Sequence, residues 1–169
     1  MFGVGQSCNV LIFYCVFFYI DFLTNTSTEK GVVIAIANSQ VREKLTAQLA
    51  TDQIPQLHIH AHNALIAEEA EIAEGSLFCA FTCVTSNAKI GKGFHANIYS
   101  YVAHDCVIGD YVTFAPSVKC NGNVHIEDHA YIGTGAIIKQ GTPDRPIVIG
   151  RGAVVGMGAV VTKSVPAGI

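Results

Sequence analysis

The sequence predicts a mainly β protein, in which a parallel β-helix over residues 57–169 follows a short, incomplete α/β (Rossmann-like) segment over residues 1–56. Three observations predict this fold. Apolar residues recur with a period of six, small residues hold fixed positions beside them, and a strand–turn–helix pattern precedes the repeat. The apolar column is unbroken from Ile66 through Ile72, Phe78, Val84, Ile90, Ala96, Val102, Ile108, Phe114, Cys120, Ile126 and Ile132 to Ile138.

A period of six fits neither an α-helix, which repeats every 3.6 residues, nor a simple strand, which alternates every two. It fits a triangular prism, in which each hexapeptide supplies one short strand and one corner and three hexapeptides close a coil. A second column, two residues before the first, is small or β-branched except at Phe94. We therefore expect a solenoid whose axis is filled by apolar residues from every side.

The repeat loses its phase once, at residues 141–146. The inward column resumes at Ile149, Val155 and Val161, which means that five extra residues are inserted. An insertion at a solenoid corner forms a loop on one face. Its Pro and Gly content suits a surface loop, and we expect this loop to border the active cleft.

The segment before the repeat has the pattern of half a nucleotide-binding βαβ unit. Residues 31–37 are β-rich and bounded by Gly and Asn, which predicts a buried strand. Asn38 or Ser39 can cap a helix over residues 40–50. The apolar run at 10–20 is shorter than the roughly 20 residues of a transmembrane helix, so buried strands are expected there, with membrane attachment as the alternative.

Composition limits the partners and the compartment. The net charge of −3 gives no basic field for nucleic acid, and charged residues make up only 14% of the chain, which hints at faces buried between subunits. The cysteines lack the second pair that a zinc site would need, and Cys106 and Cys120 fall on inward positions of the repeat. Reduced thiols then indicate a cytoplasmic protein.

Histidine spacing predicts no metal site. A metal-dependent hydratase of the γ-carbonic anhydrase type uses the same prism, and its ligands on one chain must stack at multiples of 18 residues. The histidines stand at 58, 60, 62, 95, 104, 125 and 129, and no two of them are separated by 18, 36 or 54. Because ligands must converge on one ion, a metal centre is disfavoured.

One histidine at a prism corner offers the chemistry of acyl transfer. His104 lies two residues past an inward position and precedes Asp105, so it can act as a general base beside a carboxylate. An exposed histidine without a role is the alternative. Gly122, 18 residues later, should lie one coil above His104 and expose a backbone N–H to a thioester oxyanion. Thr134 and Met157 form a second column, since their separation of 23 is one coil plus the insertion.

The stretches HDCVIGDYVTFAPSVKCNGNVHIEDHAYIGTGAII and IGRGAVVGMGAVVTKSVPAG resemble the hexapeptide-repeat sugar acetyltransferases that O-acetylate sialic acids or N-acetylate UDP-4-amino sugars. The resemblance implies a left-handed β-helix, a homotrimer and direct transfer from acetyl-CoA without a metal. It implies that His104 is the catalytic base and that Asp105 tunes it. The acetyl-CoA contacts that it implies are Thr113, Asn121, Gly122, Thr134 and Met157, and the sugar-nucleotide contacts are Ala37 and Asn38.

The chain also departs from that family. Thr113 stands where the family often carries a second histidine, and Ala37 stands where it usually carries a glycine. The Gly-rich GxGGH-type loop that holds the sugar nucleotide is reduced to GVGQS at residues 3–7, and we expect a chain shortened at both ends. N-acetylation of a UDP-4-amino sugar is the primary expectation. O-acetylation of sialic acid and a catalytically inactive trimeric scaffold are the alternatives.

Overall fold

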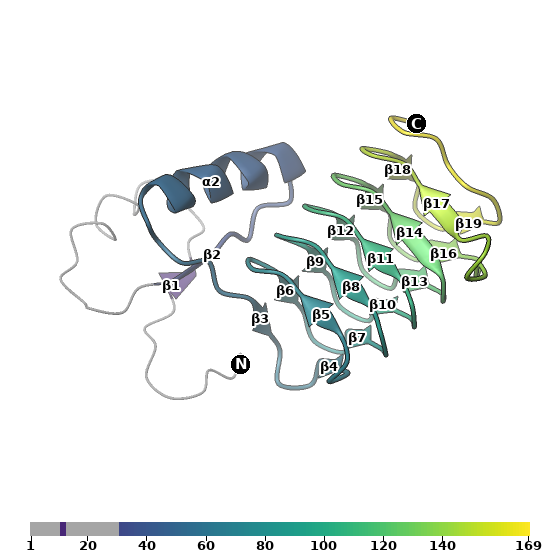
Figure 1. Cartoon of the computed structure of the whole chain (residues 1–169), viewed down its shortest axis with the longest axis horizontal. Coiled ribbons are helices and arrows are strands. Elements are labelled where there is room, and N and C mark those ends of the chain that lie inside the picture. Colours follow the sequence, from purple (N-terminus) through teal and green to yellow (C-terminus); the bar gives the residue numbers. More distant parts are fainter. Residues whose placement is uncertain (1–10, 13–30) are drawn as a thin grey trace.

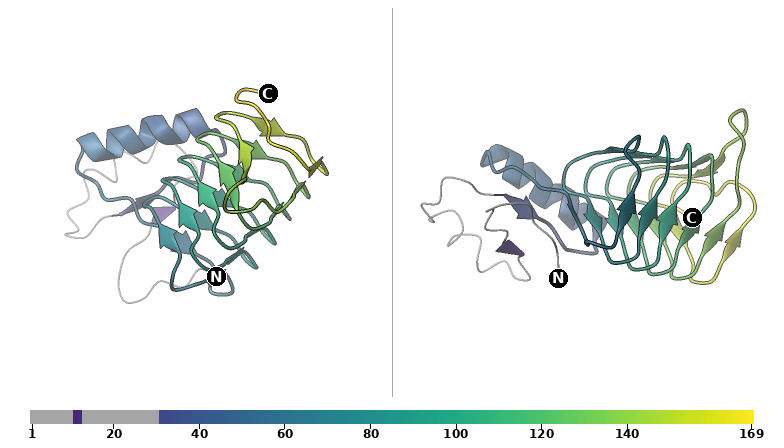
Figure 2. Two further views of the ribbon diagram at one scale, coloured as in Figure 1. Left: turned by 45° about the vertical axis from the view of Figure 1, so that its right-hand side comes forward. Right: turned by 90° about the horizontal axis from the view of Figure 1, so that it is seen from below.

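The structure is a computed structural model that describes residues 11, 12 and 31–169. From residue 59 onward the chain winds into stacked coils of very short strands (Figure 1). The two further views show an elongated prism (Figure 2). A helix, α2 (Ser39–Thr51), lies beside the coils at the N-terminal end of the prism. The predicted mainly β fold is confirmed as a parallel β-helix of the left-handed type.

Three parallel sheets form the sides of the prism. Sheet 1 contains β3 (Ile59–His60), β6 (Leu77–Phe78), β9 (His95–Ala96), β12 (Thr113–Phe114), β15 (Tyr131–Ile132) and β18 (Val154–Val155). Sheet 2 contains β4 (Leu65–Ile66), β7 (Cys83–Val84), β10 (Tyr101–Val102), β13 (Lys119–Cys120), β16 (Ile137–Ile138) and β19 (Val160–Val161). Sheet 3 contains β5 (Glu71–Ile72), β8 (Lys89–Ile90), β11 (Val107–Ile108), β14 (Val124–Ile126) and β17 (Ile147–Ile149). Each coil visits sheets 1, 2 and 3 in turn, and its corners are called 1–2, 2–3 and 3–1.

The inward column predicted from the period of six forms the core. Every residue of that column is buried from Phe78 onward, whereas Ile66 and Ile72 in the first coil are half-buried. Phe94, the one large residue of the second column, makes edge-to-face contacts with Phe78 and Phe114, with ring centroids 5.8 and 5.1 Å apart. The core therefore runs along the axis without a gap, and each coil is stabilised by its neighbours.

The corners from Gly75 to Gly135 share one backbone conformation. The second residue of each corner turn has a positive φ, which lies between 55° and 62° at the non-glycine residues Phe81, Asn87, Tyr99, Asp105, Tyr111, Ser117, Asn123 and His129. Asn and Asp adopt this left-handed conformation more readily than bulky residues do. Backbone bonds join successive corners, as from Asp105 N to Ser86 O at 3.1 Å. Corner residues 18 apart consequently lie one above the other.

The strand–turn–helix pattern is present, but its strand is shorter than predicted. β2 (Val32–Val33) pairs in parallel with β1 (Leu11–Ile12), and the remainder of the apolar run at 10–20 lies outside the described residues. The prediction of a strand over 31–37 is therefore wrong beyond residue 33. Within 34–37, three carbonyl groups accept hydrogen bonds from the side chains of His95 and Arg42, and no strand ladder continues there.

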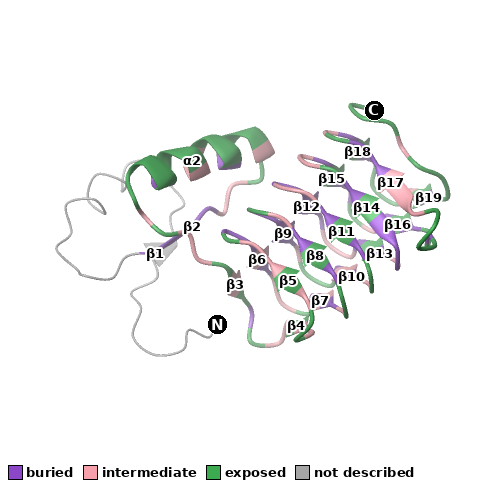
Figure 3. Ribbon diagram, in the orientation of Figure 1, coloured by how far each residue is buried: buried purple, intermediate pink, exposed green. Residues whose placement is uncertain are grey.

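Helix α2 begins one residue earlier than predicted and lies along corner 3–1. Asn38 caps it, because its side-chain oxygen accepts the N–H of Val41 at 3.0 Å. The side of the helix turned away from the coils is exposed (Figure 3). Among the described residues, no helix has the length and apolar character needed to cross a membrane. The predicted boundary at residues 56 and 57 falls in the connection between α2 and β3, where Leu57 N donates to Val32 O at 3.0 Å.

Candidate active site

His104 and Asp105 form the turn at corner 2–3, between β10 and β11. The side chain of His104 is 48% exposed, and its Nδ1 lies 2.8 Å from Oδ2 of Asp105. Because a carboxylate can only accept, the contact places a proton on Nδ1 of the neutral imidazole and leaves the lone pair of Nε2 available. The base and the acid predicted from the sequence are thus assembled at an accessible corner.

Gly122 lies one coil above His104, at the place that the spacing of 18 predicted. A Cβ atom at Gly122 would lie 2.5 Å from both Nε2 and Cε1 of the His104 ring, so only glycine leaves the imidazole where it is. One coil further, Gly141 N donates to Gly122 O at 3.0 Å. The inserted loop at 141–146 therefore begins on the same corner as the histidine.

Asn87 extends this hydrogen-bonded group and was missed in the sequence. Its Nδ2 donates to Oδ1 of Asp105 at 3.1 Å, so both carboxylate oxygens are bonded. The hydrogen bonds from His104 and then from Asn87 hold the pKa of Asp105 below its usual value, against a smaller desolvation effect. Asn87 precedes Asp105 by 18 residues, and the register rule that located Gly122 would have found it.

Thr134 and Met157 stack on each other in a second column, as predicted, and this column lies at another corner than His104. Gly158 N donates to Thr134 O at 2.8 Å, and Met157 is 82% exposed. Backbone is open here, since a Cβ atom at Gly135, Gly156 or Gly158 would meet nothing within 4 Å. This column lies at corner 1–2, whereas His104 lies at corner 2–3. One chain therefore holds the two columns at opposite edges of sheet 2.

Two residues predicted to contact acetyl-CoA have side chains that are engaged elsewhere. Thr113 is buried in sheet 1, and its Oγ1 accepts a hydrogen bond from Arg42 at 2.8 Å, so this side chain is engaged within the chain and its contact with acetyl-CoA stays a prediction. The side chain of Asn121 joins coils instead. Its oxygen accepts from the hydroxyl of Tyr101 at 2.8 Å, and its Nδ2 donates to Ile138 O at 2.7 Å.

The predicted sugar-nucleotide residues, Ala37 and Asn38, are exposed at the start of α2. They lie on the side of sheet 1, because the adjoining carbonyl of Ile34 accepts a hydrogen bond from His95 of β9 at 2.8 Å. Sheet 1 is the side of the prism opposite corner 2–3. Within one chain, these residues and His104 are therefore on opposite sides of the solenoid.

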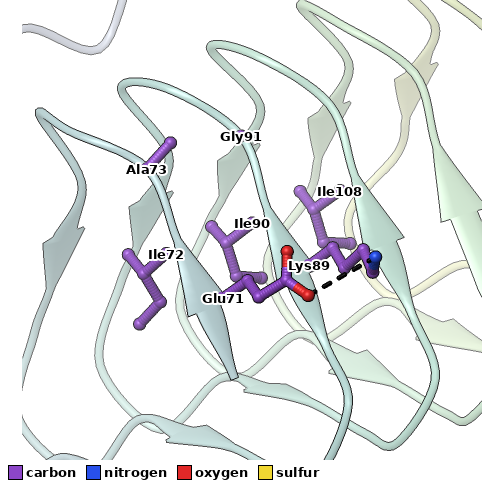
Figure 4. Close-up of a pocket in the computed structure, with 7 residues that line it drawn as sticks. All are labelled: Glu71, Ile72, Ala73, Lys89, Ile90, Gly91 and Ile108. Carbon is purple, nitrogen blue, oxygen red and sulfur yellow. Dashed lines mark ion pairs between the residues drawn. The ribbon is translucent and has the colours of Figure 1, made fainter. Parts of the chain in front are cut away.

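A pocket in sheet 3 is separate from this chemistry. It is lined by Glu71, Ile72, Ala73, Lys89, Ile90, Gly91 and Ile108 (Figure 4). Its charged members form an exposed ion pair, with Lys89 Nζ 3.4 Å from Glu71 Oε1, and such pairs contribute little. None of the predicted site residues lines it. In the part of the chain that the structure describes, no group of three or more His, Cys, Asp or Glu residues is placed to hold a metal ion.

Comparisons with known proteins match the repeat and, in the longest alignments, nearly nine-tenths of the chain. The families described as bacterial transferase hexapeptide (six repeats) and hexapeptide repeat of succinyl-transferase match residues 87–122 and 123–163. GDP-perosamine N-acetyltransferase from Escherichia coli O157:H7 is 52% identical over 148 residues, which are 88% of this chain and 67% of that protein.

Two solved structures extend the likeness. WeeI from Acinetobacter baumannii AYE is 70% identical with a TM-score of 0.86, over 89% of this chain and 71% of that one. The acetyltransferase domain of PglB from Neisseria gonorrhoeae FA1090, in complex with acetyl coenzyme A, is 26% identical with a TM-score of 0.78, over 82% of this chain and 65% of that one. These shares exceed that of the solenoid, so the likeness includes part of the N-terminal segment as well.

Proposed function

The chain belongs to the hexapeptide-repeat sugar acetyltransferases, and we propose that it transfers the acetyl group of acetyl-CoA to the amino group of a nucleotide-activated sugar. The observation that carries the proposal is the His104 imidazole, held at Nδ1 by Asp105 and lying against the bare backbone of Gly122. The likeness to an N-acetyltransferase of GDP-perosamine supports an amino-sugar nucleotide as acceptor. The acetyl coenzyme A bound to the PglB domain supports the donor.

The transfer is direct. The sugar amine attacks the thioester carbonyl, and Nε2 of His104 removes a proton from the nitrogen as the C–N bond forms. Backbone N–H groups of the corner stabilise the negative charge on the carbonyl oxygen. The C–S bond then breaks, and the imidazolium returns the proton to the sulfur of coenzyme A. The Asp105 carboxylate stabilises the imidazolium between these two proton transfers.

A homotrimer completes the site in this proposal. Four of the predicted acetyl-CoA residues lie at the two edges of sheet 2, namely Asn121 and Gly122 at corner 2–3 and Thr134 and Met157 at corner 1–2. A neighbouring copy can bring its corner 1–2 against corner 2–3. The outer side of sheet 2 and its edge carry large exposed apolar residues, namely Leu65, Phe81, Ile98, Tyr99, Met157 and Val160. Phe81 and Tyr99 stack with ring centroids 4.9 Å apart. Exposed apolar surface of this kind favours burial against a partner, and a threefold ring closes such an interface.

The nucleotide sugar is assigned to the start of α2. Ala37 and Asn38 are exposed there, and the first N–H groups of a helix favour a phosphate group. Since this segment and His104 lie on opposite sides of one solenoid, the acceptor held by one copy is acetylated at a corner of the next copy. The trimer is therefore part of the catalytic proposal.

The test begins with titration calorimetry of the full chain with acetyl-CoA, together with light scattering for its mass. A free-thiol assay then compares GDP-perosamine, UDP-4-amino sugars and sialic acids as acceptors, with mass spectrometry of the product. We expect acetyl-CoA binding by a trimer and N-acetylation of an amino-sugar nucleotide. Acetylation of sialic acid alone would replace the acceptor, and a folded trimer that does not bind acetyl-CoA would contradict the proposal and support an inactive scaffold.

A further inference from the structure

Arg42 is a fully buried cation in the first turn of α2. Its residue is 1% exposed, and burial lowers the pKa of its guanidinium to about 10, so the side chain remains charged at neutral pH. Among the described residues, no carboxylate forms an ion pair with it. A buried charge without a counter-ion is costly unless its donors are all used. The hydrogen-bond partners of the Arg42 guanidinium therefore indicate the role of this buried charge.

The guanidinium joins two parts of the chain. On one side, its Nη1 donates to the carbonyl oxygens of Ile36 and Ala37 at 2.9 and 2.8 Å. On the other side, its Nε and Nη2 donate to the solenoid at Gly93 O (3.1 Å), Tyr111 O (2.6 Å) and Thr113 Oγ1 (2.8 Å). The donors of a guanidinium form a rigid planar fork, so fixing one edge fixes the other. Arg42 thereby sets where residues 36 and 37 stand relative to corner 3–1.

His95 makes a second tie to the same segment. Its Nε2 lies 2.8 Å from Ile34 O. Burial, with a further contribution from the charge of Arg42, lowers the pKa of His95 to about 4, so the ring is neutral at neutral pH and donates Nε2–H to that carbonyl. Three carbonyl groups between residues 34 and 37 are thus held by two buried side chains.

We infer that Arg42 and His95 are positioning residues for the nucleotide-sugar acceptor, because they hold the segment that ends in Ala37 and Asn38 at a fixed place on the solenoid. The inference rests on the proposed function, in which that segment contacts the acceptor. Neither side chain lies at corner 2–3, where the acetyl transfer takes place. Their loss should therefore weaken acceptor binding and leave donor binding and the chemical step nearly unchanged.

The test is the Arg42→Lys variant of the full chain, which keeps the charge and loses the fork. Steady-state kinetics are measured with the nucleotide sugar varied and then with acetyl-CoA varied. We expect the KM for the nucleotide sugar to rise about tenfold or more, since a hydrogen bond to a charged group accounts for at least that factor in a binding constant. The KM for acetyl-CoA and kcat should change less than about threefold. The matched control is the reverse exchange, Lys44→Arg, at an exposed position of the same helix.

A second pair of variants keeps the test decisive if Arg42→Lys does not fold. His95→Leu removes the donor to Ile34, and His95→Gln retains a donor at that position, so only the first should raise the acceptor KM. If the wild-type protein is active and its acceptor KM is unchanged in both Arg42→Lys and His95→Leu, the inference is contradicted and the proposed function is not. A fall in kcat together with an equal rise in the KM of both substrates, in variants that fold, would also overturn the inference. A wild-type protein that acetylates no nucleotide sugar would overturn the proposed function and this inference together.

Discussion

His104 and His95 stand nine residues apart in the same repeat, and their surroundings give them opposite properties. His104 occupies the open corner 2–3, with a carboxylate at Nδ1 and its other nitrogen free. His95 occupies β9 beneath α2, is 6% exposed, and donates to a backbone carbonyl beside a buried cation. Within one coil of the solenoid, the histidine at the open corner is thus available for catalysis, whereas the histidine on the covered sheet has a structural role.

The comparison shows that position on the prism determines what a histidine can do here. At a corner, the side chain leaves the core and meets solvent, so a neighbouring carboxylate can stabilise its charged form. On a sheet side that another element covers, desolvation favours the neutral form. Changes at the open corner should therefore affect catalysis, whereas changes at the covered sheet should affect stability and its dependence on pH.

His104→Ala should abolish most of the activity and leave the fold intact. A general base contributes about 10²- to 10⁴-fold to a rate, and a half-exposed corner side chain contributes little to stability. Thiol release from acetyl-CoA gives kcat, and thermal unfolding gives stability. His125→Ala, at an exposed position of sheet 3, is the control. Activity within about threefold of wild type would assign the base elsewhere.

Acidification should destabilise the protein through His95. With an unfolded pKa of 6.5 and a folded pKa of about 4, the unfolded state binds the proton first. The stabilisation is therefore complete above about pH 6.5 and is lost as the pH falls toward about 4, by about 3 kcal/mol. Urea unfolding at a series of pH values measures the free energy of unfolding. His95→Gln should flatten this part of the pH dependence, and an unchanged slope in that variant would contradict the assignment.

Gly122→Ala should reduce kcat by at least about tenfold, because the new Cβ lies 2.5 Å from two atoms of the His104 ring and displaces it. The thiol assay measures the loss, and the unfolding midpoint reports any change in the fold. Ser86→Ala, at the same corner one coil earlier, adds no atom near the ring and is the control. Full activity in Gly122→Ala would show that the base does not work from its present position.

Asn87→Ala should have the smallest effect, a loss of roughly threefold to tenfold in kcat/KM, as expected for one hydrogen bond that acts through Asp105. The pKa of Asp105 should rise when this donor is removed, since the bond favours the carboxylate. An NMR titration of the Asp105 carboxyl should then have its midpoint at a higher pH than in the wild type. An unchanged titration together with an unchanged kcat/KM would leave Asn87 with a structural role only.

The repeat in the sequence is enough to predict the solenoid and the stacking of its corners. The period of six fixes which residues point inward, and a coil of 18 residues fixes which corner residues lie above one another, as Gly122 does above His104. The same spacing relates Asn87 to Asp105. The repeat pattern is periodic and local, so it can be recognised in the sequence without knowing any contact between distant elements.

The tertiary structure alone decided what the N-terminal segment does to the solenoid. Arg42 and Thr113 are 71 residues apart, and no period relates a helix in the α/β segment to a strand in the repeat. That contact engages the side chain of Thr113, one of the residues predicted to contact acetyl-CoA. Arg42 and His95 also bind carbonyl groups between residues 34 and 37, where the predicted strand does not continue. The repeat already places Thr134 and Met157 at another corner than His104, because 30 residues are not a whole number of 18-residue coils. Closing a site across sheet 2 depends instead on packing between surfaces, which no repeat encodes.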